Sequence, residues 1–288
     1  MKIGVAIIAC DRVDYTKQCI EHLLKNGNNI SEKILVNDGQ KIPYYNLLDP
    51  RKQPEIYDDK FADIQVYNND PPYQSVGKAK NKALFELMKR RCDGIFLIEN
   101  DILIKDPKVF ETYINTANAT GITHLNFGYH GPANRMQDNY DIINPRYIVE
   151  YPGNVKVNLN LHCVGAFSYF NKRYIEEVGT HDTYFKNAWE HVELCQRGIE
   201  KGLLPAFWWF PDIAGSEKML QEIPGSIEKS SITHTPEWIE NMQKGAAYYK
   251  KLHGWTPVET PDTPLEKVLA NLKNIYTKNA NVRNTPID

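Results

Sequence analysis

The sequence predicts an α/β fold in which helices flank a mostly parallel, Rossmann-like central sheet. Over the first 130 residues, short apolar runs alternate with stretches whose apolar side chains recur at helical spacing. The first apolar run, residues 3–9 (IGVAIIA), is continuous, as in a strand that is covered on both faces. Clusters of polar residues directly follow three of these runs. This arrangement is typical of a doubly wound sheet, whose ligands lie beyond the carboxyl ends of the strands.

The elements expected in this first part follow from the same patterns. Apolar runs predict strands over residues 3–9, 34–36, 64–67, 94–98 and 122–127. Helical spacing predicts helices over residues 15–27 and 76–91, and a third helix that begins at Asp106-Pro107. Gly27 is expected to end the first helix, and Ser75 to cap the second.

The second part of the chain begins with loop-like sequence at residues 130–146, which are rich in Asn, Pro and Gly. Residues 147–151 and 155–161 flank Pro152-Gly153-Asn154 and predict a β-hairpin. Further along, we expect a strand over 164–170, a helix ending at Gly179, a helix over 189–201, a strand over 206–210 and a helix opening at Thr263-Pro264. The last helix carries its apolar side chains on one side, at Leu265, Leu269, Leu272 and Tyr276. We see no internal repeat or long linker, so we expect one domain over residues 1–254, then a C-terminal helix and tail over residues 255–288.

The composition argues against several classes of protein. The formal net charge of −2 disfavours a dedicated nucleic-acid binder without excluding one, since a local basic patch is compatible with a balanced total. The five cysteines are dispersed and include no CxxC pair, which indicates free thiols in a reducing compartment. The apolar run near the N-terminus is too short to span a membrane, and no signal-peptide cleavage pattern follows it. We therefore expect a cytoplasmic protein.

An acidic triplet, Glu99-Asn100-Asp101, closes the strand over residues 94–98, where burying unpaired carboxylates would be costly. Oxygen ligands at such a strand end can hold Mg²⁺ or Mn²⁺, which would bridge a diphosphate and neutralise a leaving group. The alternative is a turn in which Asp101 caps a local backbone group. The residues alone leave both interpretations open, because acid-x-acid triplets are common.

Five segments, in this order, resemble the family 2 glycosyltransferases, which have the GT-A fold. IGVAIIACDR, ILVNDGQ, SVGKAKNKAL and FLIENDILI are similar to the family's first strand and polar turn, its V-D-D-G-S strand end, its G-x-A-R-N-x-A helix start and its acid-x-acid segment. HCVGAFSYFNKRYIEEVGTHDTYFKNAWEHVELCQRG is similar to its late stretch, which ends in E-D-x-D-x-x-x-R. The resemblance spans roughly residues 1–202. It implies a nucleotide-sugar-binding half over residues 1–128 and an acceptor-side half, with the smaller hairpin portion, over residues 129–254.

The resemblance implies donor contacts that can be carried over residue by residue. The implied donor-binding residues are Asp11, Arg12, Asn37, Asp38, Lys80, Asn81, Glu99 and Asn100. Asn37 departs from the family's usual Asp, so Asp38 is the stronger candidate for the contact with uracil or ribose. For Lys80, a polar position on a helix surface is the alternative.

A divalent cofactor, Mn²⁺ or Mg²⁺, is implied in the same way. Asp101 matches the family's metal-contacting acid, and Glu99 stands where the family usually has its first Asp. His234 lies near the region where many GT-A enzymes place a metal-binding histidine. A histidine in a surface loop is the alternative for His234.

The catalytic base is implied near the end of the resemblance. Glu190, His191 and Glu193 match the late E-D-x-D, and the family's base position is occupied here by His191. An imidazole can remove a proton at neutral pH, while Glu190 remains the alternative base. Trp189 and Glu193 are candidates for the acceptor side. At helical spacing, an ion pair between Glu193 and Arg197 is the alternative for Glu193.

The function implied is transfer of a sugar from a nucleoside diphosphate sugar, expected to be a UDP-sugar, to a hydroxyl with inversion at the anomeric carbon. The acceptor stays open between a glycan, a lipid-linked molecule, a protein and a modified DNA base. One rival is a sugar-phosphate nucleotidylyltransferase, which should carry a Gly-rich basic loop where this chain has CDRVDY. The other is a non-catalytic or degenerate nucleotide-sugar-binding protein, which is compatible with the departures at Asn37, Glu99 and His191.

Overall fold

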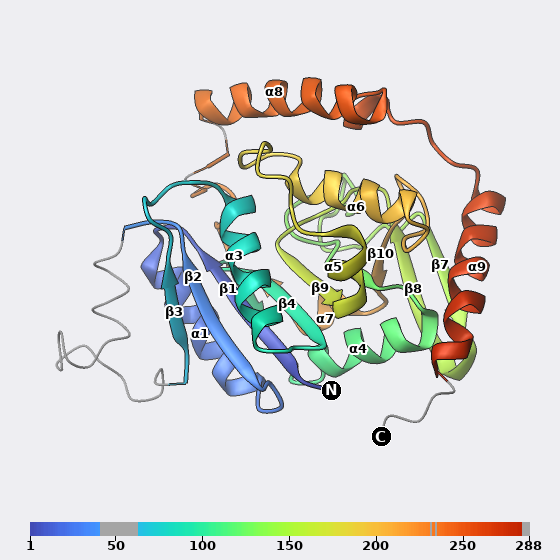
Figure 1. The fold of residues 1–288 in the computed structure, drawn as a ribbon, viewed down its shortest axis with the longest axis horizontal. Helices are drawn as coiled ribbons and strands as arrows, with labels where there is room; N and C mark the ends of the chain where they lie inside the picture. The colour runs from blue at the N-terminus through green and yellow to red at the C-terminus, as the bar shows by residue number, and fades with distance from the viewer. Residues whose placement is uncertain (41–62, 231, 234, 284–288) are drawn as a thin grey trace.

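A six-stranded sheet forms the centre of the protein (Figure 1). The computed structural model describes residues 1–40, 63–230, 232–233 and 235–283. The strand order is β3-β2-β1-β4-β9-β6. In chain order these strands are β1 (Ile3–Ala9), β2 (Glu32–Asn37), β3 (Gln65–Asn68), β4 (Gly94–Glu99), β6 (His124–Asn126) and β9 (Phe167–Asn171).

The first half of the sheet is parallel, as the sequence predicts. β1 pairs in parallel with β2 and β4, and β2 pairs in parallel with β3. Helices α1 (Val13–Asn26) and α3 (Val76–Lys89) pack against these strands, and β1 is buried along almost its whole length. The carboxyl ends of parallel strands meet at one edge of a sheet, and here Ala9 lies opposite Asn37 while Ile8 lies opposite Glu99.

The second half of the sheet is mixed. β9 runs antiparallel to both β4 and β6 and lies between them. The strands expected over residues 122–127 and 164–170 are therefore present, but shorter. An apolar run indicates a buried strand without indicating its direction, so the pattern could not show this reversal. Aromatic rings pack across the junction, with the ring centroid of Phe96 5.7 Å from that of Phe167.

Two smaller antiparallel sheets accompany the central one. The first joins β10 (Phe210–Ile213), β8 (Val155–Asn160) and β7 (Tyr147–Tyr151), and β7 and β8 form the hairpin that the sequence predicts. A 3₁₀ turn over Pro152–Asn154 connects them, with Gly153 in the left-handed region at φ 78°. The second joins β11 (Leu220–Glu222) to β5 (Ile102–Ile104), which directly follows the acidic triplet.

Two expected element boundaries are wrong. The apolar run at 206–210 is not a strand, since the N–H of Trp209 donates to the carbonyl of Ala206 in a turn and β10 begins only at Phe210. Apolar residues buried in a turn give the same signal as a buried strand. Helix α4 (Val109–Thr120) begins after Asp106-Pro107, because Asp106 accepts a hydrogen bond from the N–H of Lys108, the residue that precedes the helix.

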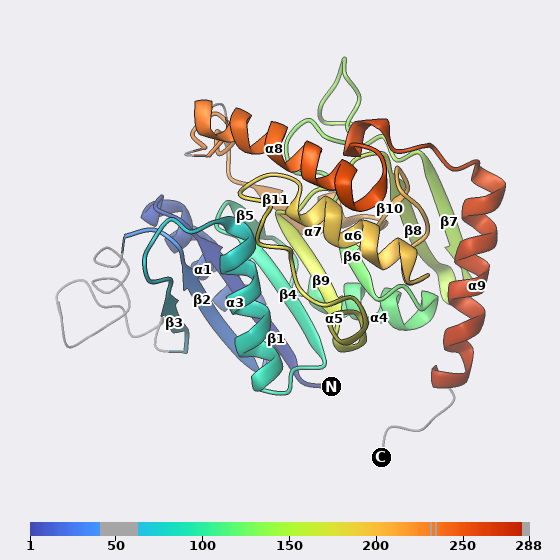
Figure 2. The same cartoon turned by 45° about the horizontal axis from the view of Figure 1, so that its top comes forward.

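The remaining helices lie in the second half of the chain. They are α5 (Lys172–Val178), α6 (Glu190–Glu200), α7 (Ser216–Met219), α8 (Pro236–His253) and α9 (Leu265–Arg283), with a 3₁₀ turn over Pro257–Glu259. Helix α8 was not predicted from the sequence, although Thr235 caps it and Pro236 opens it. In Figures 1 and 2, α8 passes above α6, and α9 runs beside β7.

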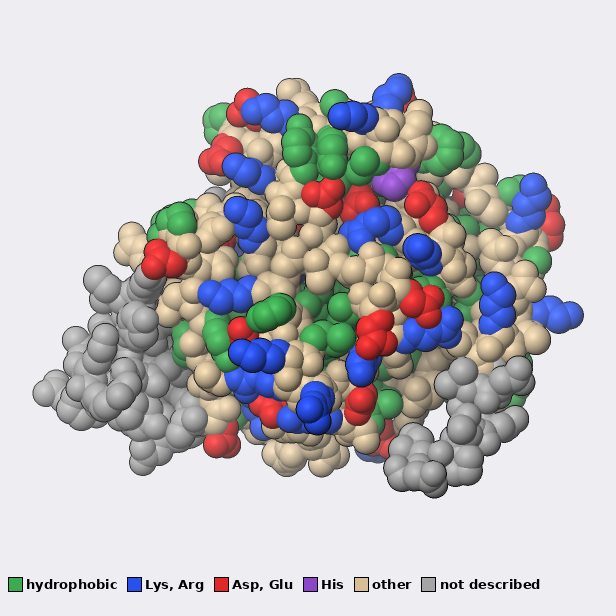
Figure 3. Space-filling view, in the orientation of Figure 1, with side chains coloured by type: hydrophobic (Ala, Val, Ile, Leu, Met, Phe, Trp, Pro, Cys, Tyr) green, Lys and Arg blue, Asp and Glu red, His purple; other side chains and the backbone are tan. Residues whose placement is uncertain are grey.

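The described surface matches the balanced composition. On the face shown in Figure 3, Lys and Arg side chains are mixed with Asp and Glu. None of the helices in the described ranges combines the length and the apolar character that a membrane span requires.

Candidate active site

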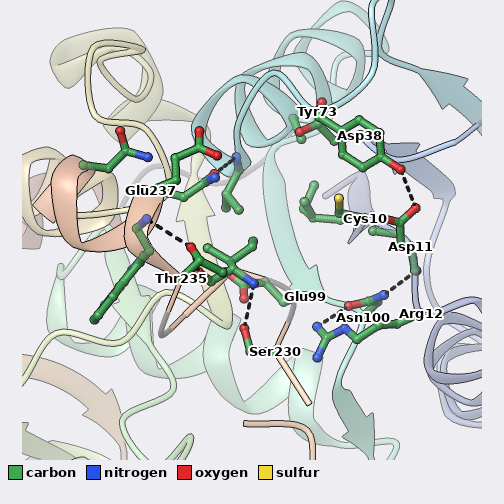
Figure 4. Close-up of a pocket in the computed structure, with 18 residues that line it drawn as sticks. Cys10, Asp11, Arg12, Asp38, Tyr73, Glu99, Asn100, Ser230, Thr235 and Glu237 are labelled. Atoms are coloured by element: carbon green, nitrogen blue, oxygen red, sulfur yellow. Dashed lines mark hydrogen bonds between the residues drawn. The ribbon is translucent and has the colours of Figure 1, made fainter. Parts of the chain in front are cut away.

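Two adjoining cavities open at the carboxyl ends of β1, β2 and β4. The strand-end cavity, of about 290 Å³, is lined by residues that include Cys10, Asp11, Asp38, Tyr73 and Asn100 (Figure 4). The helix-side cavity, of about 500 Å³, is lined by residues that include Asp101, His130, Gly165, Glu190 and His191. Both are also lined by Arg12, Glu99, Asn187 and Trp238, so we treat them as two parts of one cleft.

Asp38 is held at the end of β2 by three hydrogen bonds. Its Oδ1 atom accepts from Asn69 Nδ2 (2.6 Å) and from the backbone N–H of Gln74 (3.0 Å). Its Oδ2 atom accepts from the N–H of Ser75 (3.0 Å), the residue that caps α3. Burial raises the pKa of Asp38, and these hydrogen bonds offset that effect only in part. The structure therefore brings a fixed carboxyl group to the strand-end cavity.

Arg12 links the ends of β1 and β4. Its Nη2 atom donates to Asn100 Oδ1 (2.9 Å) and to Asp101 Oδ2 (3.1 Å), and its Nη1 atom donates to the carbonyl of Ser226 (3.2 Å). Asn100 is itself fixed by a hydrogen bond from its Nδ2 atom to Thr16 Oγ1 (2.9 Å). The guanidinium group is thus a positioned positive charge where the two cavities meet.

Asp101 has one carboxylate oxygen that the described residues leave without a hydrogen bond. This atom, Oδ1, is buried, and the buried Nε2 atom of His130, which also lacks a hydrogen-bond partner there, lies 3.7 Å away. Burial would raise the pKa of Asp101, but His130 and Arg12 outweigh it and lower the pKa. Asp101 is therefore a carboxylate with an unsatisfied oxygen that faces a histidine.

The donor set around Asp101 supplies only part of what a divalent ion requires. Within the described ranges, no three His, Cys, Asp or Glu side chains are grouped so as to hold a metal ion. Mg²⁺ and similar ions are often bound by one or two carboxylates together with phosphate oxygens and water. The unsatisfied Oδ1 of Asp101 fits an ion of that kind, but the described residues do not form a cage made by protein alone.

Lys80 is not on a helix surface but is buried behind residues that line the cleft. Its Nζ atom lies 2.9 Å from Glu99 Oε1 and 3.3 Å from Glu190 Oε1, and donates to the carbonyl of Gly165 (3.1 Å). Burial would lower the pKa of Lys80, but Glu99 and Glu190 outweigh it and raise the pKa. Lys80 thus stays charged and joins the end of β4 to the start of α6.

Glu190 and His191 form a carboxylate–imidazole pair. The Nδ1 atom of His191 lies 3.1 Å from Glu190 Oε1, the oxygen that Lys80 also contacts. Burial would raise the pKa of Glu190, but His191 and Lys80 lower it far below its usual value. For His191, burial would lower the pKa, but Glu190 raises it above 6.5. Trp189, which precedes this pair, also lines the helix-side cavity and donates its indole N–H to the carbonyl of Met242 (3.0 Å).

Four of the candidate residues do not line either cavity: Lys80, described above, and Asn37, Asn81 and Glu193. The side chain of Asn37 organises the turn after β2 by accepting from the N–H of Gly39 (2.9 Å). Asn81 donates to the carbonyl of His181 and accepts from its N–H. The carboxylate of Glu193 forms a two-point ion pair with Arg197, at 2.8 Å and 3.0 Å, so its position does not support an acceptor-side role. The His234 candidate lies outside the described residues.

Residues of the cleft that were not among the candidates include His130, Tyr73 and Trp238. His130 follows the strand-like run that ends at Phe127. It therefore lies beyond the carboxyl end of a strand, as Asp38 does. Tyr73 and Trp238 line the cleft from a loop and from the start of α8. No local pattern separates these two from other aromatic residues, since only the fold brings them to the cleft.

Comparisons with known proteins identify the class of fold. No protein-family model matches the chain, and no curated protein matches it. The solved structure of S. aureus TarS 1–349 in complex with UDP-GlcNAc matches with a TM-score of 0.52 and 12% identity, covering 96% of this chain and 73% of that chain. The mannosyltransferase PcManGT from Pyrobaculum calidifontis, in complex with GDP-Man and Mn²⁺, matches with a TM-score of 0.52 and 9% identity, covering 96% and 70%.

The longer S. aureus TarS structure matches with a TM-score of 0.50 and 11% identity over 97% of this chain, which spans 49% of that protein. At such identities the likeness shows the fold alone. The chain has the GT-A fold of glycosyltransferases: a mostly parallel central sheet with helices and a small antiparallel sheet.

Proposed function

We propose that this protein is a glycosyltransferase of the family 2 type that transfers a sugar from a UDP-sugar to an acceptor hydroxyl with inversion. The observation that carries the proposal is that a single cleft is lined by Asp38 at one end and by the Glu190–His191 pair at the other. Arg12 and Glu99 lie between them. A donor molecule that spans such a cleft can be bound by its nucleoside and react at its sugar.

The strand-end cavity is the proposed nucleoside site, and the region of Arg12 and Asp101 is the proposed diphosphate site. Asp101, through its unsatisfied Oδ1, would hold Mn²⁺ or Mg²⁺, with His130 beside it. A bound ion would stabilise the negative charge of the departing diphosphate. The complex of PcManGT with GDP-Man and Mn²⁺ supports this assignment by analogy of fold. Arg12 supplies a further positive charge that is already in place.

His191 is the proposed general base. Glu190 accepts the Nδ1–H of His191, which leaves the lone pair of the imidazole on Nε2. The acceptor oxygen attacks the anomeric carbon, its proton passes to His191 Nε2, and the bond between the anomeric carbon and the diphosphate oxygen breaks. Glu190 is less suited to be the base, because a carboxylate with a strongly lowered pKa binds a proton weakly.

A thermal-shift panel of UDP-, GDP-, CDP- and ADP-sugars, with and without Mn²⁺, tests the proposal. A ligand that binds only the folded protein must raise its melting temperature. We expect UDP-sugars to raise it, and to raise it further with Mn²⁺. If no nucleotide sugar stabilises the protein, the proposal is wrong. Stabilisation by nucleoside triphosphates and sugar phosphates, but not by nucleotide sugars, would point instead to a nucleotidylyltransferase.

A further inference from the structure

Tyr73 places an exposed aromatic ring at the strand-end cavity. The residue lies in the loop between β3 and α3 and lines the cavity, yet it is 54% exposed. Figure 4 shows the ring beside Asp38, with its hydroxyl directed at Asp11. Exposed aromatic side chains that rim a pocket are typical of sites at which a ligand covers the ring.

The ring is fixed without any ligand. The Tyr73 hydroxyl donates to Asp11 Oδ1 (3.1 Å), and the Tyr73 N–H donates to the carbonyl of Asp38 (2.5 Å). The backbone of Tyr73 has φ 59°, a left-handed conformation that is rare for a bulky residue and costs energy. A ring held in this way has lost its rotational freedom before binding, so a planar ligand can stack on it with a smaller entropic cost.

The carboxylate of Asp38 beside this ring has little capacity left to accept hydrogen bonds. A carboxylate has about four acceptor positions. Asn69 and Gln74 occupy both positions of Oδ1, and Ser75 occupies one position of Oδ2. Counted over the described residues, one position on Oδ2 remains. The site thus combines a flat apolar face with a single acceptor for a single N–H group.

Nucleobases differ in the donors that they offer to such a site. Uracil has a single N–H in its base-pairing edge, at N3. Guanine offers two adjacent donors, at N1 and N2, which match a carboxylate with both oxygens available. Cytosine presents an acceptor at N3, which a carboxylate repels. The remaining acceptor position of Asp38 therefore matches the N3–H of uracil more closely than the base-pairing edges of guanine and cytosine.

We propose that Tyr73 is the stacking platform for the nucleobase of the donor, and that Tyr73 and Asp38 together select uracil. This inference rests on the proposed function, because it assigns the nucleoside end of the same cleft. It adds a specificity-determining residue and favours a uridine diphosphate over guanosine and cytidine diphosphates.

Calorimetric titration with UDP, GDP, CDP and inorganic pyrophosphate tests this inference, since pyrophosphate has the charge of the diphosphate without the base. We expect Tyr73→Ala to weaken UDP binding about tenfold or more, as for the loss of one stacked base, and to leave pyrophosphate binding unchanged. Tyr73→Phe keeps the ring and should stay within about threefold of the parent affinity. Phe85→Ala is the matched control, because Phe85 is an exposed aromatic residue (64%) on α3 that lines neither cavity. This substitution should leave the affinities for UDP and pyrophosphate unchanged.

The outcomes separate the inference from the function on which it rests. Tyr73 is not a stacking platform if the parent binds UDP and Tyr73→Ala binds UDP equally well. The same holds if Tyr73→Ala loses as much affinity for pyrophosphate as for UDP. If the parent binds GDP or CDP as tightly as UDP, the selection of uracil is wrong. If the parent binds none of the nucleotides, the proposed function fails as well. Melting temperatures of all variants show whether a loss of affinity is a loss of folded protein.

Discussion

The Nδ1 atom of His191 lies 3.1 Å from Oε1 of Glu190, so the carboxylate sets both the orientation and the proton affinity of the imidazole. Lys80 contacts the same oxygen at 3.3 Å and stabilises Glu190 as an anion inside the protein. In the proposed mechanism the two residues therefore have different roles. His191 exchanges the proton there, and Glu190 positions the ring without being protonated itself.

The pH dependence of turnover should follow His191. The base must be neutral, and Glu190 raises the pKa of His191 above 6.5, so the rate should fall as the pH drops through a value above 6.5. In Glu190→Gln the anionic partner of His191 is absent. The fall in rate on the acid side, the acid limb of the pH profile, should therefore move to lower pH. Rates over about pH 5 to 9 check this prediction. An acid limb that stays in place in Glu190→Gln would contradict the pairing.

His191→Ala should lower the turnover number by about a hundredfold or more, as for the loss of a general base, and leave UDP affinity unchanged. Glu190→Gln should lower turnover less, because the imidazole remains. Steady-state rates with parallel UDP titrations separate catalysis from binding. If Glu190→Gln abolishes turnover while His191→Ala is tolerated, the base is Glu190.

Gly165→Ala should lower turnover while UDP binding is retained. A Cβ atom at this position would lie 2.9 Å from Cγ of His191 and 3.1 Å from Nζ of Lys80, so the imidazole would have to move. Gly77→Ala is the matched control, because there the nearest atoms lie at an ordinary 3.6 Å and alanine favours the helix. Equal turnover in both variants would show that the position of His191 is not critical.

Asp101→Asn should remove the metal-dependent part of UDP binding. The substitution retains the shape of the side chain but removes the charge that would attract a divalent ion. Titration of UDP with and without Mn²⁺ measures this part directly, and Glu111→Gln, at an exposed position on α4, is the control. If Asp101→Asn still binds UDP more tightly with Mn²⁺ than without it, the ion is bound elsewhere.

Asp38→Asn should weaken UDP binding even without metal, because its proposed partner is the base and not the diphosphate. Each oxygen of Asp38 accepts a hydrogen bond from one backbone N–H group, and asparagine replaces one of these oxygens by an NH₂ group, so we expect a loss of stability of about 1–3 kcal/mol. Titration well below the melting temperature separates the two effects. Unchanged affinity for UDP would make Asp38 a turn residue only.

The sequence was most informative where strands run in parallel. Apolar runs located β1, β2 and β4, and the rule that ligands lie at carboxyl ends selected Asp38, Glu99 and Asp101 before any contact was known. The rule did not separate Asn37 from its neighbour Asp38. Asp38 lines the cleft, whereas the side chain of Asn37 holds the turn.

Contacts that depend on the second half of the chain could not be predicted in this way. The antiparallel insertion of β9 brings Gly165 beside Lys80, and α8 brings Trp238 over both cavities. The five cysteines are free thiols, as expected, yet Cys163 and Cys195 lie with their Sγ atoms 3.5 Å apart. Their separation along the chain gave no sign of that contact.

The most direct test of the central claim is the release of UDP from UDP-sugars without an added acceptor, in the presence of Mn²⁺. Water then takes the place of the acceptor hydroxyl, so the assay requires no knowledge of the acceptor. We predict that the parent protein releases UDP from at least one UDP-sugar, and that His191→Ala binds the same sugar but releases UDP at least about a hundredfold more slowly. If the parent protein binds UDP-sugars and releases no UDP from any of them, or if His191→Ala releases it as fast as the parent, the proposed transferase mechanism is contradicted.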